Sequence, residues 1–276
     1  MNTRTIKQVI EAQETSDGAG VRLKRSIGTM QLDYLDPFLM LDEFGSEDGA
    51  DYIAGFPDHP HRGFETVTFM IDGKMRHEDN KGNGGLLSSG GVQWMTAGRG
   101  IVHSEMPEQS DGLMRGFQLW VNLPASEKMT EPRYQNLEPK EIPKLSLADG
   151  VTVRVIAGNV DGVEGAVNGI AADPTYLAVE LAPGSSFTHA LPEKQNAFVY
   201  PYEGSVFIAD RELHKSNLGV LSEGDEVLMV AGKVEARLIL VAGNPLNEPV
   251  ARHGPFVMNT REEIHQAFED YRNGRF

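Results

Sequence analysis

Two segments of the chain carry histidines and carboxylates at a spacing that suits a metal site. The first contains His59 and His61, and the second contains His103 and Glu105. Residues two apart in a β-strand point to the same face, so each pair predicts two side chains directed toward one interior. If the two strands meet inside a barrel, three imidazoles and a carboxylate converge. This donor set suits a divalent transition metal such as Fe, Ni, Cu or Zn, whereas Mg and Ca prefer all-oxygen ligands.

The elements that must position these side chains are short and β-like. Apolar, β-branched runs recur along the chain and are separated by glycine-rich turns, a pattern typical of a sandwich, jelly roll or barrel. After a predicted buried strand at 38–41, the segments fall into two series. The first comprises residues 65–72, 91–95 and 116–123, and the second comprises 151–157, 175–181, 197–202, 205–209, 226–230 and 236–242.

A proline-rich connection separates the two series. Residues 124–147 contain four prolines among Glu and Lys, with few apolar neighbours. We therefore expect one domain over 1–135, carrying the metal site, and a second over 136–276. The tail is expected to form a short amphipathic helix, because Thr260 and Glu263 make a capping box before an apolar stripe of Ile264, Ala267, Phe268 and Tyr271.

The two halves also resemble a weak internal repeat. Gly73 and Gly204 each end a strand of similar pattern. Aligning these glycines places His59, His61 and Glu65 opposite residues that bind cations poorly, namely Ala190, Pro192 and Asn196. If the halves are duplicated, we expect only the first to have kept a metal site.

Composition and charge exclude several classes of function. The 276 residues include 25 Lys and Arg against 40 Asp and Glu, so the net charge is 25 − 40 = −15. This balance disfavours direct nucleic-acid binding. The chain has no cysteine, which excludes disulfides, thiolate zinc sites and a cysteine nucleophile. Without a signal-like start or an apolar run of about 18 residues, we expect a cytoplasmic protein with no membrane contact.

Motifs of other enzymes are missing. No Gly-x-Ser-x-Gly elbow and no Walker loop occur in the sequence. Gly18 and Gly20 are better explained as turn glycines than as a dinucleotide fingerprint, since neither a helical pattern nor a third glycine follows them. Ser104 lies between two candidate ligands and, by alternation, points away from them.

Long motifs in the chain resemble those of the pirin family, a branch of the cupin superfamily. They are His59-Pro-His-Arg-Gly-Phe-Glu-Thr-Val, Gln93-Trp-Met-Thr-Ala-Gly-Arg-Gly-Ile with His103-Ser-Glu-Met-Pro, Gln118-Leu-Trp-Val-Asn-Leu, and His253-Gly-Pro-Phe-Val-Met-Asn-Thr. The resemblance spans nearly the whole chain. It implies an all-β fold of two cupin-type β-barrel (jelly-roll) domains with a short C-terminal helix, and one mononuclear metal in the first domain.

The same resemblance implies the ligand set and the metal. The family ligands fall on His59, His61, His103 and Glu105, and the usual metal is Fe(II), with Ni, Cu, Zn or Co as alternatives. In general cupins the fourth ligand would be Glu65 instead. The spacing from Glu65 to the next glycine departs from that general motif, so we assign Glu65 as a hydrogen-bond partner of an imidazole.

Two functions remain open at this point. As an enzyme, a chain of this family would be a metal-dependent flavonol (quercetin) 2,3-dioxygenase, with Glu105 also accepting a substrate proton and a pocket that includes Phe56 and Gln118. Trp94 and Trp120 are expected near the cavity. As a regulator, it would be an iron-dependent redox sensor that binds another protein. A roomy cavity would favour the enzyme and a plugged one the regulator. Among the other histidines, His77 could lie at the mouth of the cavity, but a solvated turn is the better interpretation of its surroundings.

Overall fold

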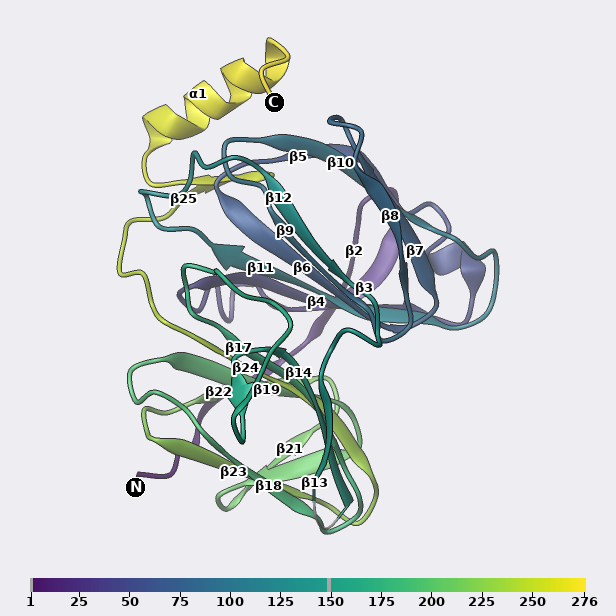
Figure 1. Ribbon diagram of the computed structural model, residues 1–276, viewed down its shortest axis with the longest axis vertical. Helices are drawn as coiled ribbons and strands as arrows, with labels where there is room; N and C mark the ends of the chain where they lie inside the picture. The colour runs from purple at the N-terminus through teal and green to yellow at the C-terminus, as the bar shows by residue number, and fades with distance from the viewer. Residues whose placement is uncertain (1, 148–149) are drawn as a thin grey trace. The chain divides into compact units, whose positions relative to one another are not determined.

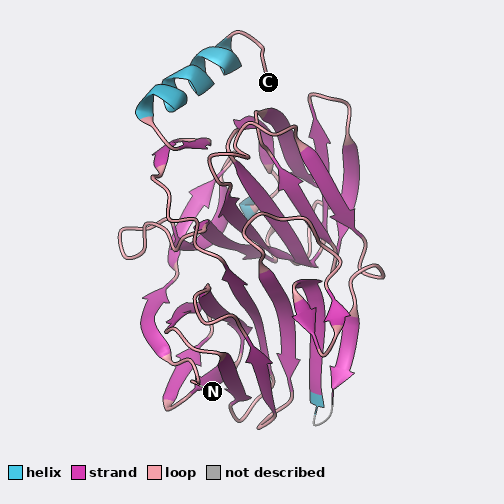
Figure 2. Cartoon of the chain, turned by 60° about the vertical axis from the view of Figure 1, so that its left-hand side comes forward, coloured by secondary structure: helices cyan, strands magenta, loops and turns pink. Residues whose placement is uncertain are grey.

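The computed structural model describes residues 2–147 and 150–276, and the chain divides into two compact units (Figure 1). The first unit, called barrel 1 below, comprises Glu14–Gly28, Phe38–Pro139 and Leu246–Phe276. The second unit, barrel 2, comprises the described parts of Met1–Gln13, Thr29–Pro37 and Lys140–Pro245. Strands dominate both units (Figure 2). No described helix has the length and apolar character needed to span a membrane.

Barrel 1 is built from two main antiparallel sheets and a small hairpin. The larger sheet has the strand order β12 (Arg133–Leu137), β9 (Val92–Thr96), β6 (Phe64–Asp72), β11 (Met114–Asn122), β4 (Phe38–Ser46), β3 (Val21–Ile27) and β2 (Gln13–Asp17). The smaller sheet has the order β5 (Phe56–His61), β10 (Ile101–Pro107), β7 (Lys74–Asp79) and β8 (Gly84–Ser88). A 3₁₀ turn, Gly49–Asp51, follows β4, and β25 (Ala251–His253) pairs with β26 (Phe256–Met258).

Barrel 2 repeats this arrangement. Its larger sheet has the order β1 (Ile6–Glu11), β22 (Asn217–Leu221), β19 (Asn196–Glu203), β24 (Ala236–Gly243), β17 (Thr175–Leu181), β14 (Val151–Ala157) and β13 (Lys144–Leu147). Its smaller sheet has the order β18 (Ser186–Ala190), β23 (Glu226–Ala231), β20 (Ser205–Ile208) and β21 (Arg211–His214). A short hairpin joins β15 (Asn159–Val160) and β16 (Val163–Glu164).

The core of each barrel lies between its two sheets. In barrel 1, Leu23, Phe44 and Met70 from the larger sheet pack with Met75 and Leu87 from the smaller one. Strand alternation explains this selection, because β7 buries Met75 and exposes Lys74 and Arg76 on either side of it. Strand β6 is buried on both faces over most of its length, which suits its β-branched and aromatic composition.

The interior of barrel 2 is lined mainly by apolar side chains. Strands β18 and β23 occupy the positions that β5 and β10 hold in barrel 1. They contribute Phe187, Val227 and Met229 to a continuous apolar core, and β18 also buries His189. The duplication expected from the sequence is therefore present at the level of strand order.

The tail forms the expected helix, α1 (Arg261–Arg272), which begins with a capping box. The Thr260 side chain accepts from the Glu263 backbone, and the Glu263 carboxylate accepts from the Thr260 backbone. Ile264 and Ala267 are buried, whereas Tyr271 is 40% exposed and contacts the rings of Phe256 and Phe276 at its edge. The expected apolar stripe thus packs at its centre and reaches solvent at its end.

Each end of the chain belongs to the other unit from the one expected from a division at 135 and 136. Strand β1 pairs with β22 of barrel 2, and the tail from Leu246 onward clusters with barrel 1. Pairing of this kind depends on the free backbone edge of a distant strand, which a local hydrophobic pattern does not record. The all-β architecture with two jelly-roll units and a C-terminal helix is confirmed.

Candidate metal centre

Strands β5 and β10 lie side by side as an antiparallel pair and bring the two histidine segments together (Figure 1). His103 is directly opposite His59, and Ile101 is opposite His61. The register shifts between His103 and Glu105, so that Glu105 is opposite Phe56. Alternation then directs His59, His61 and His103 to the interior of barrel 1.

The three imidazoles form a compact cluster. Each contributes one ring nitrogen, and these nitrogens all lie within 4.8 Å of one another. Ring centroids are 4.4 Å apart for His59 and His103, 4.7 Å for His59 and His61, and 5.1 Å for His61 and His103. A cluster of this size needs to contract only slightly for the three nitrogens to share one ion with bonds of about 2.0–2.1 Å.

The hydrogen-bonding state of the rings fits a metal ion. Nδ1 of His61 and both ring nitrogens of His103 are buried, and none of the described residues hydrogen-bonds to them. Buried polar atoms are rarely left unpaired, because each costs about 1–3 kcal/mol. Nδ1 of His59 lies 2.8 Å from the Pro57 carbonyl oxygen, and donation to that oxygen leaves Nε2 of His59 as the ligand atom.

Burial holds His61 and His103 in their neutral, metal-binding form. Desolvation lowers the pKa of His61 well below its ordinary value, and the neighbouring His103 and His59 lower it further. Desolvation likewise lowers the pKa of His103, with contributions from His59 and His77. Because a metal binds the neutral imidazole, this environment favours coordination over protonation at neutral pH.

Glu105 lies beside the histidine cluster but is not a member of the group within 4.8 Å among the described residues. It is 4% exposed, and burial raises its pKa, whereas His59 and the hydroxyl of Thr68 lower it. Thr68 Oγ1 lies 2.9 Å from Glu105 Oε1. The Thr68 hydroxyl therefore holds one carboxylate oxygen and leaves the other available.

Gln118 belongs to the same polar chain. Thr68 Oγ1 lies 2.6 Å from Gln118 Oε1 and has a single proton to donate. When that proton is given to Glu105, the Gln118 amide must present its NH₂ to the hydroxyl. Gln118 thus orients the threonine that orients Glu105, and its side chain also lines the adjacent pocket.

Glu65 differs from its expected role as a partner of an imidazole. Its Oε1 accepts from Thr96 Oγ1 at 2.6 Å. Glu65 and Thr68 are three residues apart in β6, so their side chains leave opposite faces of the sheet. Glu65 therefore faces away from the cluster, where burial raises its pKa to about 7.

His77 was expected in a solvated turn, and that prediction was wrong. It lies in β7 opposite Glu105 and is 4% exposed, and its buried Nδ1 has no partner in the part of the chain that the structure describes. Its ring centroid is 5.6 Å from that of Tyr134. The alternation of Met75 and His77 with exposed Lys74 and Arg76 was the sequence signal that could have placed it inside.

A buried lysine fixes the turn that follows His61. Lys128 Nζ donates to the Gly63 carbonyl at 2.8 Å, to Asn122 Oδ1 at 2.7 Å and to the Val257 carbonyl at 3.0 Å. Gly63 has φ +87°, and a Cβ there would lie 2.0 Å from the Val257 oxygen. Only glycine allows β6 and the β25–β26 hairpin to approach this closely.

A pocket of about 580 Å³ opens beside the histidines, entirely within barrel 1. Phe56, Trp120 and Met40 supply apolar walls, and His59, His61, Glu105 and Gln118 are also part of the lining. Trp94, expected near the cavity, is buried on the same face of the sheet as Glu65 and does not line the pocket. The volume lies in the range of small-molecule sites, about 300–1,000 Å³.

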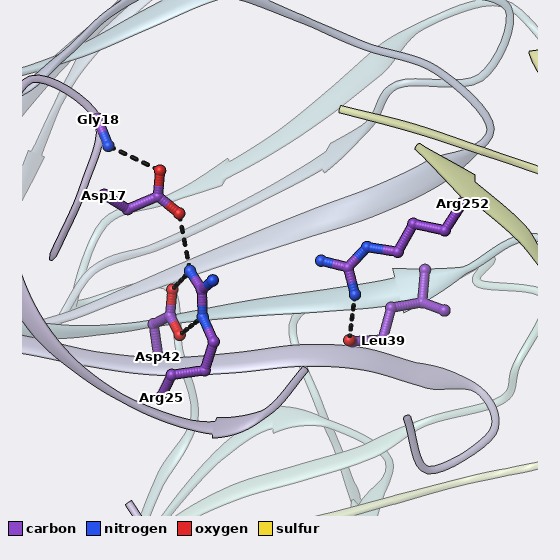
Figure 3. A network of polar contacts seen from close by, with 6 residues as sticks. All are labelled: Asp17, Gly18, Arg25, Leu39, Asp42 and Arg252. Atoms are coloured by element: carbon purple, nitrogen blue, oxygen red, sulfur yellow. Dashed lines mark hydrogen bonds and ion pairs between the residues drawn. The ribbon is translucent and has the colours of Figure 1, made fainter. Parts of the chain in front are cut away.

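Charged side chains line another part of the pocket (Figure 3). Arg25 donates to both oxygens of Asp42, at 2.8 and 2.7 Å, and to Asp17 at 2.7 Å. Arg252 donates to the Leu39 carbonyl at 3.1 Å, and its Cζ lies 5.2 Å from the Trp120 ring centroid. The Trp120 ring is in turn 5.2 Å from that of His61, so the indole separates an arginine from a candidate ligand.

Comparison with known proteins agrees with this site and fold. Residues 20–121 match the Pirin family, and residues 176–276 match the Pirin C-terminal cupin domain. A pirin-like protein of Caulobacter vibrioides is 50% identical over 100% of both chains. The pirin of Homo sapiens is 47% identical, covering 99% of this chain and 94% of its own length.

A solved structure extends the likeness to three dimensions. The crystal structure of quercetin 2,3-dioxygenase from Acinetobacter baumannii superposes with a TM-score of 0.91 at 35% identity, covering 99% of this chain and 98% of the other. The resemblance seen in the sequence motifs is thereby confirmed in both halves. The chain belongs to the pirin family of two-domain cupins.

Proposed function

We propose that this chain binds one divalent transition metal through His59, His61, His103 and Glu105, and that it is a flavonol 2,3-dioxygenase. The convergence of three imidazole nitrogens within 4.8 Å, two of them from buried residues, beside a pocket of about 580 Å³ is the observation that carries the proposal. The likeness to a protein described as quercetin 2,3-dioxygenase supports the same reaction class. Fe(II) is our first choice of metal, with Ni, Cu, Zn and Co as alternatives.

The metal, when bound, supplies a Lewis-acidic and redox-active centre on which a flavonol and O₂ can be activated. In the overall reaction one O₂ is consumed, the central ring of the flavonol opens, and carbon monoxide is released. Both oxygen atoms enter the ring-opened product, so no external reductant is required. The protein must therefore bind a flat aromatic molecule, remove one hydroxyl proton and limit the access of water.

Glu105 is the group placed to accept that proton. Burial raises its pKa and makes the carboxylate more basic than an exposed one, while the Thr68 hydroxyl fixes one of its oxygens. The remaining oxygen can receive a proton from a substrate hydroxyl in the pocket. Phe56 and Trp120 present apolar surfaces against which flat rings can pack, and Gln118 supports the Glu105–Thr68 pair.

The size of the cavity favours this reading over a purely regulatory one. A redox-sensing regulator that binds another protein needs the metal but does not need room for a substrate, whereas a dioxygenase needs both. A pocket of about 580 Å³ with aromatic walls meets the second requirement. The regulatory role stays an alternative that uses the same four side chains.

The test is oxygen consumption with quercetin after loading the purified protein with Fe(II), Ni(II), Cu(II) or Zn(II) in turn. We expect turnover and carbon monoxide release with at least one metal, and loss of both in His61→Ala and Glu105→Gln. His214→Ala is the matched control, because His214 is exposed in barrel 2 and 66% of its side chain is accessible. Equal turnover in all three variants, or none with any metal, would refute the proposal.

A further inference from the structure

A second, basic groove lies on barrel 1 between helix α1 and the segment that leads into and out of β25. It has a volume of about 900 Å³. Its cationic or protonatable lining consists of Arg252, His253, Arg261, His265 and Arg272. None of its lining residues is Asp or Glu, although the chain as a whole carries −15. The groove is therefore a local reversal of the charge of the molecule.

The helix presents these charges along one face. Arg261, His265, Phe268 and Arg272 follow one another at spacings of four, three and four residues, which places them on a single stripe. Two acidic residues of the helix, Glu263 and Asp270, are engaged elsewhere. Asp270, for example, accepts from Arg62 at 2.8 Å and from Arg275 at 2.9 Å.

Arg261 and Arg272 lie at the two ends of the stripe. Within residues 2–147 and 150–276, neither of them forms an ion pair. Both are exposed. Between them, Ile264, Phe268 and Val250 give the groove an apolar floor. A ligand that fits has negative charge at both ends and apolar groups in the middle.

The distance between the two arginines restricts which ligands of that chemistry can bind. Arg272 is eleven positions after Arg261, and this corresponds to a rise of about 16 Å along an α-helix. An extended peptide rises about 3.3 Å per residue, so about five residues span this distance. A single phosphate or a small dicarboxylate cannot reach both arginines and also cover the apolar floor between them.

We propose that this groove binds an extended acidic peptide segment of a partner protein, with carboxylates toward Arg261 and Arg272 and apolar side chains on Ile264 and Phe268. The site is separate from the histidine cluster. Arg252 is a residue that lines both the groove and the metal-site pocket. Binding in the groove does not depend on whether the cluster is catalytic.

The test is fluorescence anisotropy of the full-length protein with a labelled seven-residue peptide, Glu-Glu-Leu-Glu-Leu-Glu-Glu. We expect saturable binding that weakens with added salt, since exposed ion pairs are screened over about 10 Å at 0.1 M. The double variant Arg261→Gln/Arg272→Gln should weaken binding about twofold to thirtyfold, the range for two exposed pairs. Arg211→Gln/Lys233→Gln removes the same charge from exposed positions of barrel 2 and should leave binding unchanged.

Control ligands distinguish specific peptide binding in the groove from non-specific attraction between opposite charges. A peptide with Gln in place of Glu should not bind. Tripolyphosphate and a single-stranded DNA oligomer should compete with the acidic peptide only weakly. Equal loss in both double variants, no binding of the acidic peptide, or stronger binding of the polyphosphate or DNA would overturn the proposal. Circular dichroism of each variant establishes that the fold is retained, because all four substituted side chains are exposed.

Discussion

Replacing Lys128 with methionine tests how the turn after His61 is held. Lys128 is 1% exposed and donates to three acceptors in barrel 1. The substitution Lys128→Met fills a similar volume but leaves the Gly63 and Val257 carbonyls and the Asn122 side-chain oxygen unpaired. Each buried unpaired acceptor costs about 1–3 kcal/mol, or about 3–9 kcal/mol for the three.

Relief of a buried charge offsets part of this loss. Burial lowers the pKa of Lys128 from 10.5 to about 8. The difference corresponds to roughly 3 kcal/mol of desolvation cost at neutral pH, at 1.36 kcal/mol per pH unit. The net expectation is a free energy of unfolding lower by about 0–6 kcal/mol, with about 3 kcal/mol as the central value.

The pH dependence of this difference has a definite sign. Because the folded pKa lies below the unfolded one, the unfolded chain binds more protons between about pH 8 and pH 10.5. Wild-type stability attributable to Lys128 therefore rises with pH across that window, and the gap to Lys128→Met widens. A gap that narrows across the same window would contradict the desolvation account.

The assay is urea unfolding at pH 7, followed by tryptophan fluorescence in the presence of EDTA. The chain has two tryptophans, Trp94 and Trp120, and both lie in barrel 1. Their emission therefore reports on the unit that contains Lys128. Lys74→Met is the control, because Lys74 is exposed on β7 of the same barrel. A loss no larger than that of Lys74→Met would refute the reasoning.

Three further predictions concern barrel 1 and use the same unfolding assay. The pKa of Glu65 in the folded chain is raised from 4.5 to about 7, so its favourable contribution to the free energy of unfolding is complete below pH 4.5 and is lost as pH rises through 7. Glu65→Gln should remove this pH dependence of stability and be more stable than wild type at pH 8 by up to about 3 kcal/mol. An unchanged pH dependence in the variant would contradict the assignment. Gly63→Ala should cost more than about 2 kcal/mol, because φ is +87° and the added Cβ meets the Val257 oxygen; a near-neutral effect would show that this turn can relax. Arg25→Gln leaves Asp42 buried without its ion-pair partner and should cost about 3–5 kcal/mol at pH 7, with less cost at pH 4 where that carboxyl can protonate; equal cost at both pH values would argue against a charge effect.

Strand positions and the histidine cluster were predictable from the sequence because both follow local periodicity. The expected segments 151–157 and 175–181 coincide with β14 and β17, and the expected segments 65–72 and 116–123 differ from β6 and β11 by one or two residues at their ends. The spacing His59-x-His61 was sufficient to place both rings on one face of β5.

Other features depend on contacts that local patterns do not encode. The pairing of β1 with β22 joins residues more than 200 positions apart, and no pattern in the first thirteen residues identifies that partner. The sequence did not show which face of its strand Glu65 occupies. Glu65 follows His61 by four residues, but a turn lies between them, and the side chain emerges on the opposite face of β6. Lys128 gave no signal either, because a lone lysine near prolines is usually solvated.

The basic groove shows the same limit at the surface. The sequence did not predict an anion-binding surface, because the net charge is −15 and the sequence has no basic run. The helical repeat of α1 and the neighbouring β25 gather Arg252, Arg261 and Arg272 from separated positions in the tail. Surface charge therefore has to be evaluated on the folded chain rather than from its sum.

Metal stoichiometry tests the central claim most directly. Purified protein is stripped with EDTA, dialysed against Fe(II) without oxygen or against Ni(II) in air, and analysed by inductively coupled plasma mass spectrometry. We predict about one ion per chain for wild type and for His214→Ala, and less than about one tenth of an ion for the variant His59→Ala/His103→Ala. A wild-type chain that retains no ion under any condition, or a double variant that retains as much as wild type, would contradict the assignment of a metal to His59, His61 and His103.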